Sequence, residues 1–125
     1  MGITYDTGAL LAAERNQRTL WALHRRALER GVRPTVPAGV LGQAWRGGPQ
    51  AELSRLLKGC RIETLDETRS RAAGQACACT GSSDVIDATV VVGAIARADL
   101  VVTSDPDDIA HIADGLNTRL DILTV

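Results

Sequence analysis

The sequence predicts one α/β domain over residues 1–125, with a mostly parallel five-stranded sheet flanked by helices on both faces. Short apolar or β-branched runs alternate along the chain with segments of helical periodicity. The length of 125 residues is that of an ordinary domain, and no linker divides it. Short strands separated by helices are typical of a parallel sheet that is covered on both faces.

In the first half of the chain, most of the expected helices have an identifiable start or stop. Asp6 or Thr7 can cap the first helix, because their side-chain oxygens can accept a hydrogen bond from a free backbone N–H group. Gly31 ends the second helix, and residues 47–49, Gly-Gly-Pro, form the clearest break in the chain. The expected elements are a strand at 3–5, helices at 8–15 and 17–30, a strand at 34–37 and a helix at 39–46.

The second half follows the same alternation. Asp66 is a candidate helix cap, and the Gly-Ser-Ser sequence at 81–83 is a turn. The segment 85–98 is apolar nearly all round, which predicts a helix buried on more than one side. The expected elements are helices at 51–57, 66–79, 85–98 and 106–113, and strands at 61–65, 100–103 and 122–125.

Composition excludes several classes of protein. There is no Phe, and Trp21, Trp45 and Tyr5 are the only aromatic residues, so stacking of single-stranded bases is not expected as the main binding device. No run approaches the roughly 20 apolar residues of a membrane span. The three cysteines, an odd number with no signal-like segment, are expected to be reduced. We therefore expect a cytoplasmic protein that does not associate with membranes.

The charge is unevenly distributed, although the formal net charge is only −1. Up to Ile62 there are ten Lys or Arg residues against four Asp or Glu, and from Glu63 onward there are four against eleven. This asymmetry fits a basic surface beside an acidic cluster. Ordinary solvated helix faces remain an alternative explanation.

Carboxylates recur next to apolar elements. Asp6 and Asp105 follow expected strands, and Asp87 lies among apolar residues at the start of the helix expected at 85–98, three residues after Asp84. Ligands gather at the carboxyl ends of the strands in open parallel sheets. Several neighbouring carboxylates need a cation to offset their repulsion, and Mg²⁺ prefers such oxygen ligands. If these chain segments converge, they form a cluster of metal ligands.

Each of these acids also has a purely structural explanation. Asp6 can cap the first helix, Asp84 can be an acid favoured by the helix dipole, and Asp105 can cap a helix whose first residue is Pro106. Asp87 is the hardest to explain in this way, because apolar residues surround it in the sequence. Asp107 and Asp108 are interpreted as charges at a helix end, with contact to a metal-bound water as the alternative. Capping and metal binding can coexist at one residue.

Three motifs, taken in order and with their spacing, resemble a known family. They are Tyr5-Asp6-Thr7-Gly8-Ala9-Leu10-Leu11, then Asp84-Val85-Ile86-Asp87-Ala88, then Val102-Thr103-Ser104-Asp105-Pro106-Asp107-Asp108. The chain resembles the PIN domain, and within it the VapC-type ribonuclease toxins of bacterial toxin and antitoxin pairs, over essentially its whole length. The tripeptide Asp6-Thr7-Gly8 also occurs in aspartic proteases, but their all-β architecture does not fit this chain.

The resemblance implies an acidic site that binds Mg²⁺, with Mn²⁺ as a substitute, through Asp6, Asp87 and Asp105. Asp84 would be an additional catalytic acid, and Thr103 or Ser104 would orient ligands. This chain departs from the family at Gln43, where the family usually has a glutamate. A neutral oxygen at this position weakens a metal site or leaves it dependent on Asp84 or Glu14.

The activity implied by the resemblance is metal-assisted hydrolysis of RNA phosphodiester bonds. Arg15 and Arg46 are candidates for holding the flanking phosphates, with surface solvation or packing over Trp45 as the alternative. The implied partners are an RNA substrate, a cognate antitoxin and a second copy of the chain in a homodimer. The competing hypothesis, motivated by Gln43, is a PIN-like domain that binds RNA or a protein partner with little or no cleavage.

Overall fold

A sheet of five short parallel strands runs through the middle of the molecule in the computed structural model, which describes residues 2–125. All four pairings between neighbouring strands are parallel. The predicted mostly parallel sheet of five strands is therefore confirmed. The strand order is β3 (Arg61–Glu63), β2 (Thr35–Pro37), β1 (Ile3–Tyr5), β4 (Leu100–Thr103) and β5 (Ile122–Thr124).

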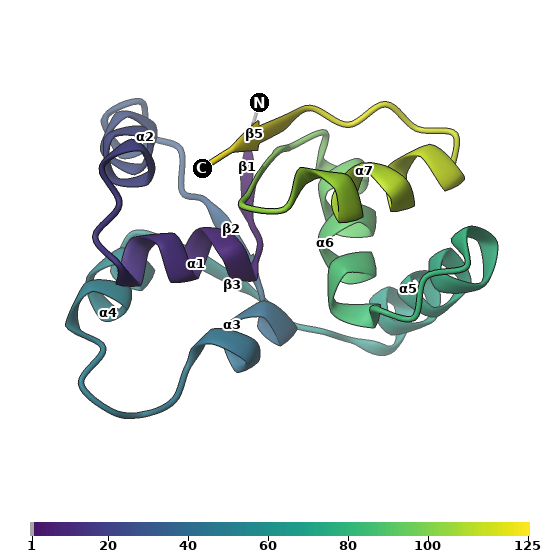
Figure 1. Cartoon of the computed structure of the whole chain (residues 1–125), viewed down its shortest axis with the longest axis horizontal. Helices are drawn as coiled ribbons and strands as arrows, with labels where there is room; N and C mark the ends of the chain where they lie inside the picture. Colours follow the sequence, from purple (N-terminus) through teal and green to yellow (C-terminus); the bar gives the residue numbers. More distant parts are fainter. Residues whose placement is uncertain (1) are drawn as a thin grey trace.

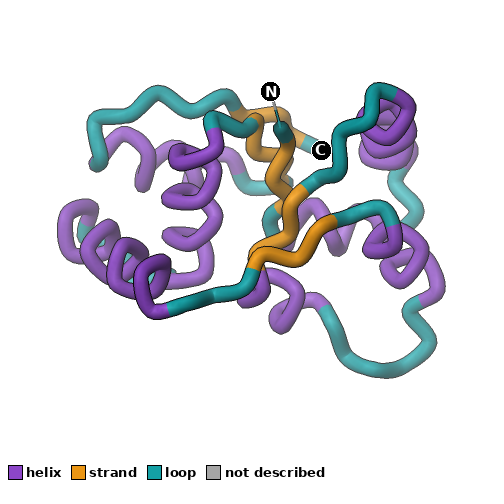
Figure 2. Tube along the Cα trace, turned by 180° about the vertical axis from the view of Figure 1, so that it is seen from behind, coloured by secondary structure: helices purple, strands orange, loops and turns teal. Residues whose placement is uncertain are grey.

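Helices cover both faces of the sheet, as predicted (Figure 1). On one side lie α1 (Thr7–Glu14), α2 (Arg18–Glu29) and α4 (Ala51–Lys58), and on the other lie α5 (Glu67–Thr80), α6 (Val85–Arg97) and α7 (Pro106–Gly115). The short helix α3 (Ala38–Ala44) continues directly from β2. Figure 2 shows the same arrangement from behind, with the strands between two groups of helices.

Local sequence signals set most of the helix ends. The side chain of Asp66 accepts a hydrogen bond from the backbone N–H of Arg69 and so caps α5, while Gly81 ends that helix with a positive φ of 73°. The third strand stops at Glu63, two residues earlier than predicted. Its neighbour β2 ends at Pro37, opposite Glu63, and α3 begins at once, so the residues after Glu63 have no strand to pair with.

The core between the layers is aliphatic, with one polar pair at its centre. Leu10, Leu20 and Val101 are fully buried, and so is Tyr5, whose hydroxyl is 2.9 Å from Nδ1 of the buried His24. Burial of apolar area of this kind is the main favourable contribution to folding. The hydrogen bond satisfies the one polar atom of Tyr5, which would be costly to bury alone.

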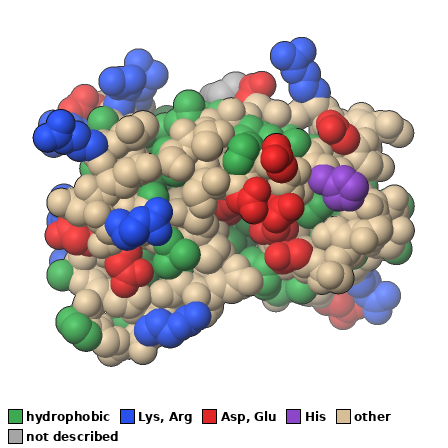
Figure 3. Space-filling model, viewed as in Figure 1, with side chains coloured by type: hydrophobic (Ala, Val, Ile, Leu, Met, Phe, Trp, Pro, Cys, Tyr) green, Lys and Arg blue, Asp and Glu red, His purple; other side chains and the backbone are tan. Residues whose placement is uncertain are grey.

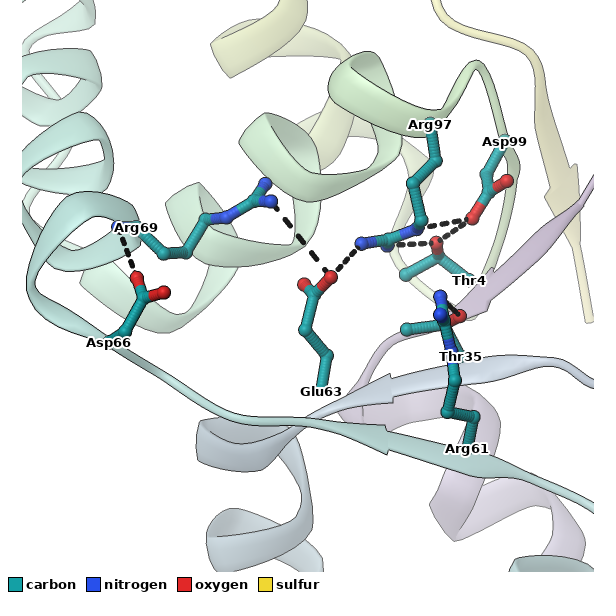
Figure 4. Close-up of polar contacts among 8 residues, drawn as sticks. All are labelled: Thr4, Thr35, Arg61, Glu63, Asp66, Arg69, Arg97 and Asp99. Atoms are coloured by element: carbon teal, nitrogen blue, oxygen red, sulfur yellow. Dashed lines mark hydrogen bonds and ion pairs between the residues drawn. The ribbon is translucent and has the colours of Figure 1, made fainter.

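A second polar group, the Arg97 network, ties the strands to α6 (Figure 4). The Nε of Arg97 donates to Asp99 across 2.9 Å, one of its terminal nitrogens donates to Thr4 across 2.9 Å, and the other pairs with Glu63. Glu63 also lies 3.9 Å from a terminal nitrogen of Arg69 on α5. Ion pairs and hydrogen bonds of this network therefore join β1, β3, α5 and α6.

The structure bears on two predictions made from composition, those on the cysteines and on membrane-spanning segments. Cys60, Cys77 and Cys79 are all free thiols. Within residues 2–125, no single helix combines the length and apolar composition needed to cross a membrane, and α5 with α6 reaches them only as a pair bent by 107°.

Candidate functional site

The predicted acids lie after two neighbouring strands and at the start of one helix, on one side of the molecule. Strands β1 and β4 pair in parallel, with Tyr5 opposite Val102, so Asp6 and Asp105 follow strands that end at the same edge of the sheet. Asp84 and Asp87 lie at the start of α6. Figure 3 shows acidic side chains gathered on this face, with Lys and Arg side chains standing away from them. We call Asp6, Asp84, Asp87, Asp105 and Asp108 the acid cluster.

Asp6 is buried, with 5% of its surface exposed, and both of its carboxylate oxygens are engaged. One oxygen accepts a hydrogen bond of 2.9 Å from the backbone N–H of Ala9, which makes Asp6 the cap of α1, and the other accepts from the Thr103 hydroxyl. Burial raises the pKa of Asp6, the Thr103 and Ala9 hydrogen bonds oppose that rise, and the charge of Asp105 adds to it. Asp6 therefore has two roles in the structure: it caps α1, and its charge interacts with that of Asp105.

The Thr-Ser pair after β4 positions the cluster in two ways. The buried hydroxyl of Thr103 donates to Asp6 and accepts a hydrogen bond of 2.9 Å from the backbone N–H of Asp105, so one side chain links the two strand ends. Ser104 is exposed, and its hydroxyl lies against Gly8: a Cβ atom at Gly8 would be 2.0 Å from it. Glycine at this position lets the start of α1 approach the β4–α7 connection closely.

The pKa of Asp87 shows that the other acids lie close to it. Its pKa is raised from 3.8 to about 7, first by burial and then by the negative charges of Asp84, Asp6 and Asp108. Asp84 is the cap of α6, because its side chain accepts a hydrogen bond of 3.0 Å from the backbone N–H of Asp87. As a structural alternative, we expected Asp84 to be an acid favoured by the helix dipole; it instead caps α6 through this hydrogen bond, and it also acts electrostatically on Asp87. Carboxylates at the starts of α1, α6 and α7 are therefore close enough for their charges to affect one another.

The structure does not support a helix cap as the explanation for Asp105, and Asp108 is more than a charge at a helix end. Asp105 occupies the position before α7, but its side chain makes no capping hydrogen bond, so capping does not account for this residue. Asp108, interpreted from the sequence as a helix-end charge, instead has its pKa raised by a hydrogen bond and charge repulsion with Asp105, with a further contribution from Asp84. The three-residue spacing of Asp105 and Asp108 at a helix start is the sequence signal that could have identified the pair.

Within the described residues, the acid cluster has no cationic partner. The five ion pairs found among residues 2–125 use Glu52, Glu63, Glu67 and Asp99, and none uses a member of the cluster. An all-oxygen donor set with uncompensated negative charge fits a hard divalent cation such as Mg²⁺ in its chemistry. In the described part of the chain, however, no three His, Cys, Asp or Glu side chains converge closely enough to hold a metal as they stand. The metal-ligand role of Asp6, Asp87 and Asp105 stays a prediction.

Gln43 lies beside the cluster. Its side-chain oxygen accepts a hydrogen bond from the hydroxyl of Thr7, the residue that follows Asp6. A glutamate here would place another carboxylate next to the start of α1. One oxygen of Glu14, the other residue considered as a substitute, accepts a hydrogen bond of 2.9 Å from the side chain of Gln50.

A small hollow of about 360 Å³ opens between the end of α1 and the α3–α4 connection. Gln50 builds its wall: this buried amide donates to Glu14 and to the Ala44 carbonyl, and accepts from the backbone N–H groups of Arg46 and Gly47. Sequence reasoning missed Gln50, since nothing local distinguishes it from a surface glutamine. The hollow is lined by Leu11, Glu14, Gln43, Ala44, Arg46, Gly48, Pro49 and Gln50.

Comparison with solved structures identifies the fold. The chain is similar to the crystal structure of VapBC2 from Rickettsia felis bound to a DNA fragment from their promoter, with a TM-score of 0.74 and 14% identity over 100% of this chain and 99% of that chain. It is also similar to PAE2754 from Pyrobaculum aerophilum, with a TM-score of 0.65 and 14% identity over 98% of this chain and 88% of that chain. No family model and no curated protein sequence matches this chain.

The parallel five-stranded sheet, its two layers of helices and these similarities define a PIN-like α/β fold. Within that class, the fold matches that of the VapBC2 structure, in agreement with the resemblance of the sequence motifs.

Proposed function

We propose that the chain is a Mg²⁺-dependent endoribonuclease, the toxin of a type II toxin and antitoxin pair. The observation that carries this proposal is the acid cluster: five aspartates near the carboxyl edge of a PIN-like sheet influence one another, and none forms an ion pair with a cation of residues 2–125. Uncompensated repulsion lowers stability, so its presence at a ligand-binding edge supports a functional role.

The residues divide the work as follows. Asp6, Asp87 and Asp105 would hold the cation, with Asp84 and Asp108 adding negative potential around it. Bound Mg²⁺ supplies charge stabilisation at the phosphate and a water of lowered pKa. Thr103 holds Asp6 and the backbone of Asp105 in position through its two hydrogen bonds.

The basic first half of the chain supports an RNA substrate. Arg15 is exposed at the end of α1, and Arg46 is exposed beside Gln43 at the end of α3. One terminal nitrogen of Arg46 donates to the carbonyl oxygens of Gly42 and Trp45, at 3.3 Å and 2.8 Å, so its guanidinium is anchored at one nitrogen only. Contacts of arginine with phosphates would make RNA binding weaken as salt concentration rises.

The partners belong to the same proposal. The similar structure from Rickettsia felis is a VapBC2 assembly on promoter DNA, which supports an antitoxin as the partner of this chain. The homodimer expected from the family resemblance and a cytoplasmic location complete the proposed assignment.

The test is Mg²⁺- or Mn²⁺-dependent cleavage of structured RNA by the purified chain and two matched variants. Asp6 and Asp66 each cap a helix through one carboxylate oxygen, but only Asp6 belongs to the acid cluster. We expect Asp6→Asn to lower cleavage at least 100-fold and Asp66→Asn to leave it within a factor of two. Equal residual activity in the wild type and both variants would overturn the proposal.

The competing function is a PIN-like domain that binds RNA or a protein partner without cutting. Gln43 favours it, because a neutral amide stands where the family usually has an acid, and so does the lack of three converging ligands among residues 2–125. RNA binding with full affinity, but without cleavage in either metal, would favour this second function.

A further inference from the structure

We infer that the hollow between α1 and the α3–α4 connection binds a guanine base of the RNA next to the cleaved phosphate. This inference deepens the proposed ribonuclease function and rests on it. The hollow has a volume of about 360 Å³ and combines apolar and polar walls. Such a mixture is typical of sites for small planar ligands.

The charges in the hollow are its most informative feature. Glu14 and Arg46 both line it, yet no ion pair joins them in the part of the chain that the structure describes. Each therefore keeps hydrogen-bonding capacity for a ligand. Glu14 has one oxygen held by Gln50 and the other unengaged among the described hydrogen bonds, and Arg46 has nitrogens beyond the one that binds carbonyl oxygens.

This combination of acceptor and donor selects among bases. The edge of guanine offers two adjacent donors, N1–H and the N2 amino group, and also the acceptors O6 and N7. A carboxylate can accept from the two donors together, while a guanidinium or amide donates to O6 or N7. Adenine, cytosine and uracil do not present two adjacent donors. Recognition of unstacked bases through such edge contacts is the usual mode for single-stranded RNA.

The hollow also lies at the right place for a base near the cut. Gln43 is one of its lining residues, and the oxygen of Gln43 accepts a hydrogen bond from Thr7, beside Asp6. Glu14 is eight residues beyond Asp6 on α1, which is roughly 12 Å at about 1.5 Å per residue. A strand whose phosphate lies at the acid cluster can therefore place a neighbouring base in the hollow.

The hydrogen bonds of Gln50 hold the wall of the hollow in place, which supports a role in recognition. The buried Gln50 amide uses both of its hydrogens and its oxygen on Glu14, the Ala44 carbonyl and the backbone of residues 46 and 47. These hydrogen bonds fix the position of the Glu14 carboxylate and the course of the connection. A preorganised acceptor loses less entropy when it binds a ligand.

The experiment measures binding in EDTA, so it is independent of metal and of cleavage. The probes are guanosine, inosine and adenosine 5′-monophosphates, titrated into the full chain and followed by the NMR shifts of the Gln43 and Gln50 side-chain amides. We expect guanosine monophosphate to bind on the order of ten-fold more tightly than the other two, because inosine lacks the N2 amino group. Equal affinity for the three nucleotides would overturn the inference.

Two variants test whether the preference for guanine depends on Glu14. In Glu14→Gln, the new amide oxygen can still accept from Gln50, but the side chain can no longer accept from two guanine donors at full charge. We expect this variant to bind guanosine and adenosine monophosphates within a factor of two of each other. Glu29→Gln, an exposed glutamate at the end of α2, should keep the full preference. A guanine preference that survives Glu14→Gln would contradict the assignment.

A cleavage map separates this inference from the proposed function. In Mg²⁺, the wild type should cut RNA beside guanines, and Glu14→Gln should cut with at least ten-fold less selectivity. Cleavage that ignores guanine would overturn the subsite and leave the ribonuclease proposal standing. Absence of cleavage, together with a guanine preference in EDTA that Glu14→Gln removes, would overturn the ribonuclease proposal and support the base site.

Discussion

Glu63 and Asp99 pair with guanidinium groups, whereas none of the ion pairs among residues 2–125 includes Asp6, Asp87 or Asp105, and the charged groups that act on Asp6 and Asp87 there are other carboxylates. In the Arg97 network, each acid lies within 4.0 Å of an arginine nitrogen, and the hydroxyl of Thr4 hydrogen-bonds both Arg97 and Asp99. In the acid cluster, burial and like charge raise the pKa of Asp87 to about 7. Both groups lie beside the same small sheet.

The difference separates acids that stabilise the fold from acids that are available for a ligand. A paired carboxylate contributes to stability when its partner and hydrogen bonds offset its desolvation. An unpaired, half-buried carboxylate costs free energy, and a bound cation can remove that cost. The first group is therefore expected to determine stability, and the second to determine metal binding.

The largest effect on stability is expected from Arg97→Met. The substitution removes the only cation among residues 2–125 that pairs with Asp99 and leaves that buried carboxylate, together with Glu63, poorly compensated. We expect the free energy of unfolding to fall by about 3 kcal/mol. Urea denaturation measures this change. A loss below about 0.5 kcal/mol would show that the network is only a surface feature.

A divalent cation should have the next largest effect. At a Mg²⁺ concentration 100 times the dissociation constant, binding to the folded state alone adds about 2.7 kcal/mol to the free energy of unfolding. Thermal denaturation with and without Mg²⁺ measures this stabilisation. The Asp6→Asn variant should show little of it and Asp66→Asn all of it. The same shift in all three proteins would place the cation outside the acid cluster.

The third prediction concerns pH in the absence of metal. Burial and neighbouring charges raise the folded-state pKa of Asp87 from 3.8 to about 7, so the stability that its protonated form contributes is fully present below about pH 3.8 and is lost as pH rises through 7. Since Asp87 is half-buried and solvent screens part of the repulsion, we expect Asp87→Asn to stabilise the metal-free chain by about 2 kcal/mol at pH 8. Unfolding curves at pH 5 and pH 8 measure the difference. No gain at pH 8 would mean that Asp87 is well solvated.

The smallest effect is expected from Gln43→Glu. A carboxylate at this position would lie next to Thr7, at the edge of the acid cluster, and would add one charged oxygen ligand or neighbour. We expect Mn²⁺ to bind about ten-fold more tightly, which corresponds to about 1.4 kcal/mol. Calorimetric titration gives the affinity, with Gln75→Glu on the exposed side of α5 as the control. Equal affinities in both variants would show that position 43 is outside the reach of the metal.

Much of the fold could be predicted because its signals are local. Apolar runs indicated the strands, and the candidate caps Asp6 and Asp66 marked the starts of α1 and α5. The proximity of Asp6 and Asp105 also followed from the sequence, since both follow strands of a parallel sheet.

The remaining features depend on contacts between distant segments. Arg97 meets Glu63 across 34 residues and Thr4 meets Asp99 across 95, and neither pairing has a local pattern. The end of β3 at Glu63 depends on where its neighbour β2 ends. The spacing of Asp105 and Asp108 is a local signal, but the influence of Asp84 on Asp108 depends on the packing of α6 against α7.

The central claim is that the acid cluster is held ready for one captured divalent cation. Anomalous diffraction from crystals soaked in Mn²⁺ tests it most directly. We predict a strong manganese peak between the carboxylates of Asp6, Asp87 and Asp105, with these side chains drawn closer together than in the metal-free chain. Crystals that hold manganese only elsewhere, or hold none while the cluster is open to solvent, would contradict the account.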